Sequence, residues 1–124
     1  MTLVAGYSMN STTGQLSSDG QTSTDFHFGS LPANAQGGDC LLSFTITTDH
    51  FPGLQVHAIL NDGPDIWGYF NPPNGVSGPM QLHLQIGFNG LEHAPINNKI
   101  TFKIVEGTGR MDINQCVVWY QQNV

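Results

Sequence analysis

One short segment of the sequence combines aromatic side chains with uncharged polar ones. Trp67 and Tyr69 alternate in it, and Asn71 and Ser77 follow closely. A flat ring stacks on the C–H face of a sugar, while amide and hydroxyl groups hydrogen-bond to sugar hydroxyls. The alternative is that both aromatic residues belong to the core of a short strand and that the loop behind them is only a connection. The residues by themselves leave both interpretations open.

Metal binding and catalysis find little support in the sequence. The five histidines lack the close spacing of a standard zinc motif, and neither a cysteine pair nor a Glu-rich cluster accompanies them. His57 and His83 lie on the polar faces of two predicted strands and would meet only if those strands were close. There is no nucleophile elbow, phosphate loop or Cys–His pair at a recognisable spacing, although two distant carboxylates could still converge as in a glycosidase. We therefore predict a protein that is not an enzyme and that holds no metal and no other cofactor.

Cys40 and Cys116 are the only cysteines, and two states are open to them. A disulfide would close a long loop and contribute about 4 kcal/mol in the chain-entropy model. Alternatively, both residues are buried thiols in strands, where cysteine packs as a small apolar residue. We favour the two thiols.

The balance of charges limits the kinds of partner. The chain of 124 residues has a formal charge of −6 at pH 7, and its only cations besides histidine are Lys99, Lys103 and Arg110. A phosphate backbone would be repelled, so nucleic acid is not a predicted partner. Only 10% of the residues are charged, against about 25% in an average soluble domain. Such a surface suits uncharged polar ligands.

The sequence contains neither a membrane span nor a visible export signal. No apolar run approaches the roughly 20 residues needed to cross a bilayer, so membrane insertion is not expected. The first residues lack the basic region and the apolar core of a signal peptide. A secreted or cell-surface location would therefore need another route, and a cytoplasmic location is also compatible with the sequence.

Apolar and polar residues alternate with the period of two that is typical of half-buried strands. The clearest case is residues 80–88, where Met80 and Leu82 lie on one face and Gln81 and His83 lie on the other. We expect this strand to lie in the core. The predicted strands are 3–7, 24–29, 42–46, 54–60, 66–70, 80–88, 99–104 and 110–121.

The last predicted strand differs from the others because it becomes continuously apolar in residues 116–120. A strand that is apolar on both faces needs cover on both, either from a second sheet or from another subunit. This run is therefore an indication of an oligomer.

Short strands, frequent turns and the lack of a helical period predict one all-β domain spanning residues 1–124. Pro52 and Gly53 separate two of the strands, and Asp62-Gly63 supplies the positive φ that a hairpin turn demands. About seven to nine strands without an internal repeat favour a β-sandwich of the jelly-roll type.

Short motifs in residues 51–124 carry a resemblance to a known family. They are Phe51-Pro52-Gly53-Leu54 with Ala58, then Asn61 and Gly63, then Gly78-x-Met80, Val105-x-Gly107, Met111-x-Ile113 and Trp119. On these residues the chain resembles the N-terminal domain of the two-domain bacterial superlectins, a fucose-binding module with a tumour-necrosis-factor-like (TNF-like) jelly roll. The resemblance extends loosely to the strand that precedes residue 51.

The resemblance implies a compact homotrimer that holds the sugar between neighbouring subunits through hydroxyl groups and two arginines. Ser77 falls where the family has a hydroxyl, and Tyr69 lies within a residue of a binding tyrosine. Pro79 and Glu106, however, stand where the two arginines would be expected. Arg110 could supply the guanidinium group only if the turn at residues 107–109 brings its side chain back to the site.

We predict a trimeric lectin that binds glycans, with fucosylated glycans implied by the resemblance, at shallow sites between subunits. The predicted ligand contacts are Tyr69, Ser77 and Arg110, with Trp67 and Asn71 as secondary candidates. The alternative is a structural or attachment module, such as a fibre-tip, capsid or protein-docking trimer without a sugar site. The loss of both family arginines favours this alternative.

Overall fold

The chain is all-β, and the part that the structure describes contains no helix. The structure is a computed structural model, and it describes residues 3–35, 39–48, 54–63, 69–70, 78–87, 92 and 96–123. The strands in chain order are β1 (Leu3–Asn10), β2 (Gly14–Ser17), β3 (Ser23–Phe28), β4 (Asp39–Thr48), β5 (Gln55–Leu60), β6 (Tyr69–Phe70), β7 (Gly78–Gly87), β8 (Asn98–Glu106) and β9 (Arg110–Asn123).

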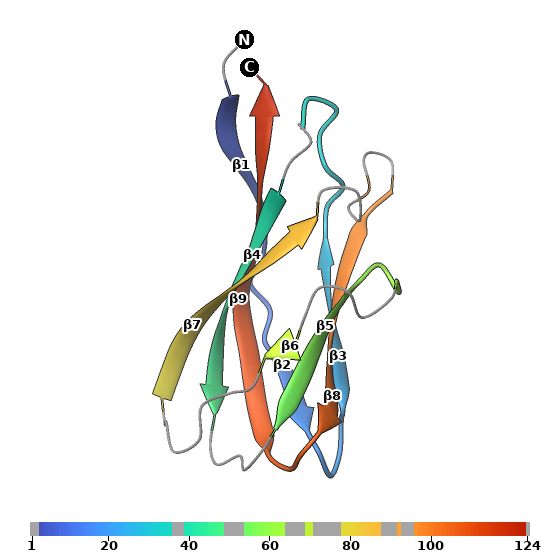
Figure 1. Cartoon of the computed structure of the whole chain (residues 1–124), viewed down its shortest axis with the longest axis vertical. Coiled ribbons are helices and arrows are strands. Elements are labelled where there is room, and N and C mark those ends of the chain that lie inside the picture. Colours follow the sequence, from blue (N-terminus) through green and yellow to red (C-terminus); the bar gives the residue numbers. More distant parts are fainter. Residues whose placement is uncertain are drawn as a thin grey trace.

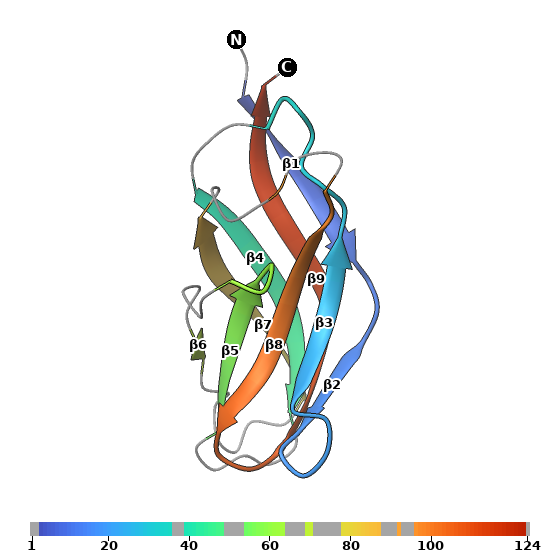
Figure 2. The same cartoon turned by 90° about the vertical axis from the view of Figure 1, so that its right-hand side faces the viewer.

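The strands form two antiparallel sheets. The five-stranded sheet has the order β1-β9-β4-β7, and β2 pairs with the first residues of β9 while β1 pairs with its second half. The four-stranded sheet has the order β3-β8-β5-β6. Figures 1 and 2 show the two sheets as two layers, with both ends of the chain at the same end of the molecule. The predicted all-β class and β-sandwich architecture are confirmed.

The two strands on either side of Pro52-Gly53 belong to different sheets. β4 pairs with β7 and β9, whereas β5 pairs with β6 and β8. The chain therefore passes from one layer to the other between them instead of forming a hairpin. Residues 49–53 themselves lie outside the described part of the chain.

The turn after β5 lies where the Asn-Asp-Gly sequence predicts it. The Gly63 N–H donates to the Leu60 carbonyl at 2.9 Å, which closes a four-residue turn. Asn61 and Asp62 have φ values of 52° and 58°. Two central residues with positive φ are typical of the type I′ hairpin turn. The turn is confirmed, but Asn61 and Asp62 supply the positive φ that we expected from Asp62-Gly63.

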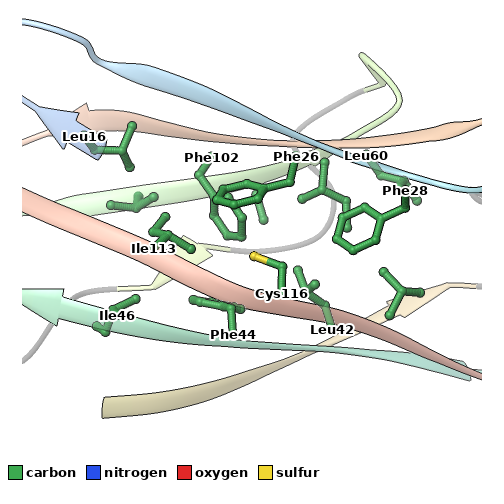
Figure 3. Packing of buried hydrophobic residues seen from close by; sticks show 14 of the residues in the cluster. Leu16, Phe26, Phe28, Leu42, Phe44, Ile46, Leu60, Phe102, Ile113 and Cys116 are labelled. Carbon is green, nitrogen blue, oxygen red and sulfur yellow. The ribbon is translucent and has the colours of Figure 1, made fainter. Parts of the chain in front are cut away.

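Phe102 of β8 lies at the centre of the core between the two sheets. It is fully buried, and its ring packs edge-on against Phe26 at a centroid distance of 5.6 Å. It also packs against Phe44 of the opposite sheet, at a centroid distance of 5.0 Å. Figure 3 shows these rings between the layers, with the sulfur of Cys116 pointing into the same interior. The three rings thus join β3, β4 and β8 in one core.

β7 does not have the central place that its sequence suggested. Among the described strands it pairs only with β4, at the edge of the five-stranded sheet. Met80, Leu82 and Leu84 pack against the core but are only partly buried. The expectation that this strand lies in the core is confirmed only in part, because a period of two identifies the face that turns inward and not the position of a strand in its sheet.

Cys40 and Cys116 are buried thiols and do not form a disulfide. Cys40 lies opposite Ile86 of β7, whereas Cys116 lies opposite Asn10 of β1. Burial raises the pKa of the Cys116 thiol to about 12, so it stays protonated at neutral pH. The favoured of the two states is confirmed, and both residues pack as small apolar side chains.

Candidate functional site

The structure places the predicted ligand contacts in two different sheets. Tyr69 begins β6 in the four-stranded sheet and pairs with His57 of β5. Arg110 begins β9 in the five-stranded sheet and pairs with Ser17 of β2. The other candidates lie outside the described residues: Trp67, Asn71 and Ser77. Strand pairing thus does not bring Tyr69 and Arg110 together within one chain.

Arg110 is exposed at the end of the sandwich where two turns meet. The Ser18 N–H donates to the Gly109 carbonyl at 3.0 Å, and the Gly109 N–H donates to Ser18 Oγ at 2.9 Å. The Ser17 hydroxyl donates to the Asp19 carboxylate, and this bond, with a smaller effect of the Arg110 guanidinium, lowers the pKa of Asp19. An exposed guanidinium among hydroxyl groups offers several donors to the oxygens of a sugar.

The outer face of the five-stranded sheet carries a cluster that the sequence analysis did not identify as a site. The cluster consists of Tyr7, Met9, Leu41 and Trp119, whose exposed fractions are 61, 58, 40 and 39%. We call these four residues the aromatic face. The register places Tyr7, Trp119 and Leu41 side by side on β1, β9 and β4.

The two rings of the aromatic face contact each other. The centroids of Tyr7 and Trp119 are 5.5 Å apart, with an angle of 46° between the planes. The indole Nε1 of Trp119 donates to Ser43 Oγ on β4 at 3.1 Å, which fixes the orientation of its ring. A fixed pair of rings presents apolar surface either to a sugar ring or to another protein.

A β-bulge in β9 determines that Trp119 points outward. Met111 and Ile113 face the core, so strict alternation would bring Trp119 into the core as well. At Gln115, which has a φ of 53°, two residues of β9 lie opposite Phe44 of β4. The extra residue reverses the alternation beyond it. Cys116 therefore faces the core, and Trp119 lies on the outer face.

The two rows of residues that cross the aromatic face carry no formal charge at pH 7. Two rows cross the middle of this outer face in register: Tyr7, Trp119, Leu41 and Gln85, and next to them Met9, Val117, Ser43 and His83. The polar members Gln85 and His83 are exposed on the edge strand β7. The surface is thus apolar in its middle and neutral at this edge.

The histidines do not gather into a metal site in the described part of the chain. There, no three His, Cys, Asp or Glu side chains are grouped so that they could hold a metal ion. His57 and His83 lie in different sheets, on β5 and β7. His50 and His93 fall outside the described residues. No helix capable of spanning a membrane occurs among the residues described.

Comparison with known proteins does not place the chain in a family. No protein-family model matches it, and no curated protein is significantly similar to it. The resemblance to the superlectin domain accordingly rests on the short motifs alone.

Proposed function

We propose that the chain is a glycan-binding lectin that assembles as a homotrimer through its five-stranded sheet. The observation that carries the proposal is the exposed aromatic face, with its contact between Tyr7 and Trp119. Contiguous exposed apolar patches of this kind mark interaction sites. In this assembly a neighbouring subunit covers Trp119, so both faces of the apolar run in β9 are covered.

The strand order supports a jelly roll of the TNF-like class within this proposal. In a double-sheet jelly roll two Greek keys interlock, so the chain passes repeatedly between the sheets. Here β3 lies in the four-stranded sheet, β4 in the other, β5 and β6 in the first again, and β7, β8 and β9 alternate in the same way.

A copy of the same chain is the partner that the charge pattern favours. Each copy carries a formal charge of −6, and like charges placed opposite each other oppose association. The two rows across the outer face avoid this cost because they contain no formal charge. An apolar centre with a polar rim is also the usual composition of a protein–protein interface.

A matched pair of charge substitutions tests the trimer. Trp119→Glu adds a charge to the aromatic face, while Val105→Glu adds one to the other sheet at nearly equal exposure, 39 against 40%. By size-exclusion chromatography with light scattering, we expect three chain masses for the wild type and for V105E, but one for W119E with an unchanged circular dichroism spectrum. Tyr7→Glu, on the neighbouring strand, should act like W119E. A wild-type monomer, or a trimer that survives both changes, would exclude this interface.

Glycan binding is supported by the donors that the surface offers outside the aromatic face. Arg110 is exposed and lies in register with Ser17, and the neighbouring Ser18 accepts a hydrogen bond from the Gly109 N–H. In a trimer each site occurs three times, so weak binding of single sugars would be strengthened by avidity.

A glycan array with the labelled protein tests the lectin assignment. We expect saturable binding to a related set of glycans and no effect of a chelator. Arg110→Ala should weaken binding about tenfold or more, because hydrogen bonds from a charged donor are lost, and should leave the trimer intact. Unchanged binding would remove Arg110 from the site. If the folded trimer bound nothing on the array, the structural or attachment module would be the better assignment.

A further inference from the structure

We infer that the outer face of the four-stranded sheet binds the carboxylate group of an acidic sugar, with Lys103 as the central contact. The inference rests on the proposed lectin function, because it names the class of glycan. The face lies on the sheet opposite to the aromatic face, so assembly through the five-stranded sheet would leave it accessible.

Four neighbouring strands contribute one residue each to a row across this sheet. Ser23 of β3 lies opposite Lys103 of β8, and Lys103 lies opposite His57 of β5. His57 in turn lies opposite Tyr69 of β6. Adjacent strands are about 4.8 Å apart, so the first three residues span about 10 Å, close to the length of a disaccharide. We call Ser23, Lys103 and His57 the basic row.

The basic row faces away from the core. Ser23 and Lys103 are exposed and His57 is half-buried. The residues that alternate with them along β8 and β5, Phe102 and Val56, are fully buried. The Ser23 hydroxyl and the Lys103 ammonium are therefore presented together on one side of the sheet, next to the backbone position of His57.

The two lysines of this sheet differ in whether a carboxylate already pairs with them. Lys99 Nζ donates to both carboxylate oxygens of Asp62, at 2.8 and 2.9 Å. Lys103 forms no ion pair with any carboxylate in the described part of the chain. Asp25, one row away, accepts a hydrogen bond from Thr101 Oγ1 at 2.6 Å. The ammonium of Lys103 is thus the cation of this face that is open to a ligand.

The surrounding charge selects a ligand with one isolated negative group. An ammonium group beside a hydroxyl group can donate charge-assisted hydrogen bonds to a carboxylate. A polyanion such as nucleic acid would meet the repulsion of a chain with a charge of −6. A single carboxylate on an otherwise neutral glycan meets Lys103 with little of that repulsion. Sialic acids and uronic acids share this chemistry.

Calorimetric titration with matched sugars tests the inference. 3′-Sialyllactose and lactose differ by the sialic acid, and digalacturonate provides a uronic acid to compare with neutral galactobiose. We expect one acidic member to bind at least tenfold more tightly than its neutral partner at low salt, and the difference to shrink at high salt. The preferred acid identifies the source of the carboxylate.

Two lysine substitutions on the same strand make the test specific. Lys103→Gln should reduce binding of the acidic sugar to the level of its neutral partner. Lys99→Gln, which removes an equal charge that Asp62 already pairs, should leave the preference within about twofold. A preference that persists in K103Q would overturn the inference. Equal binding of acidic and neutral sugars by the wild type would also overturn it while leaving the lectin proposal standing; binding of no glycan on the array would instead contradict the lectin proposal.

Discussion

Phe102→Ala is expected to lower the free energy of unfolding by about 3–5 kcal/mol, the usual cost of removing a fully buried phenylalanine ring. Phe102 contacts Phe26 in its own sheet and Phe44 in the other. Removing the ring therefore leaves a cavity between the two sheets. The cavity can close only if the strands of one sheet move relative to those of the other.

Denaturant unfolding followed by circular dichroism at one fixed protein concentration measures this effect, since assembly makes stability depend on concentration. Val105→Ala is the control, because Val105 lies on the same strand but on its exposed side. It should change stability by no more than about 0.5 kcal/mol. A loss below about 1 kcal/mol for F102A would show that Phe102 is not at the centre of the core.

Asn98→Ala should be the most costly substitution of a polar residue, at about 3 kcal/mol or more. The side chain of Asn98 is buried and connects three segments of the chain. Its Oδ1 accepts from Asn61 Nδ2 at 3.0 Å and from the Glu92 N–H at 2.7 Å. Its Nδ2 donates to the carbonyls of Gly29 and Glu92 at 3.2 and 3.1 Å. Alanine leaves these groups without their partner, at about 1–3 kcal/mol for each one that stays buried.

Asn98→Asp separates the accepting from the donating role of this side chain. The introduced carboxylate would still accept both bonds, but it would face the two carbonyl oxygens of Gly29 and Glu92. This contact raises its pKa in the folded state above the unfolded value, so N98D should be more stable at pH 4 than at pH 7 relative to the wild type. Asn97→Ala, at an exposed neighbouring position, is the control and should change little. A stability of N98D that does not depend on pH relative to wild type would contradict the two donated bonds.

Alternation predicts most of the strands because the buried face of each follows from its own residues. It fails for β2, because residues 14–17 are not among the strands that alternation predicts. Leu16 is the one large apolar residue of β2, and its pairing with Met111 brings it into the core. Gly14 fits only without a side chain, since a Cβ atom there would lie 2.9 Å from the ring of Phe26. Both facts depend on distant parts of the chain.

The aromatic face could not be predicted from the sequence for the same reason, because its residues come from distant parts of the chain. The apolar run in β9 predicted that Trp119 would need cover, but the side on which it needs cover depends on the bulge at Gln115. Tyr7 comes close to it only because β1 pairs with β9. Of the predicted ligand contacts, Tyr69 and Arg110 are placed, in separate sheets, and their roles stay predictions.

The pairing of β1 with β9 also fixes the order in which the fold can form. Leu3 lies opposite Asn123, so β1 cannot pair until β9 has been synthesised. β9 is also the strand that holds β2 and β4 in the same sheet. Contacts between residues so far apart in sequence make folding slow compared with that of helical bundles. The four-stranded sheet likewise depends on β8, which lies between β3 and β5, so neither sheet can be complete until the last two strands of the domain have been synthesised.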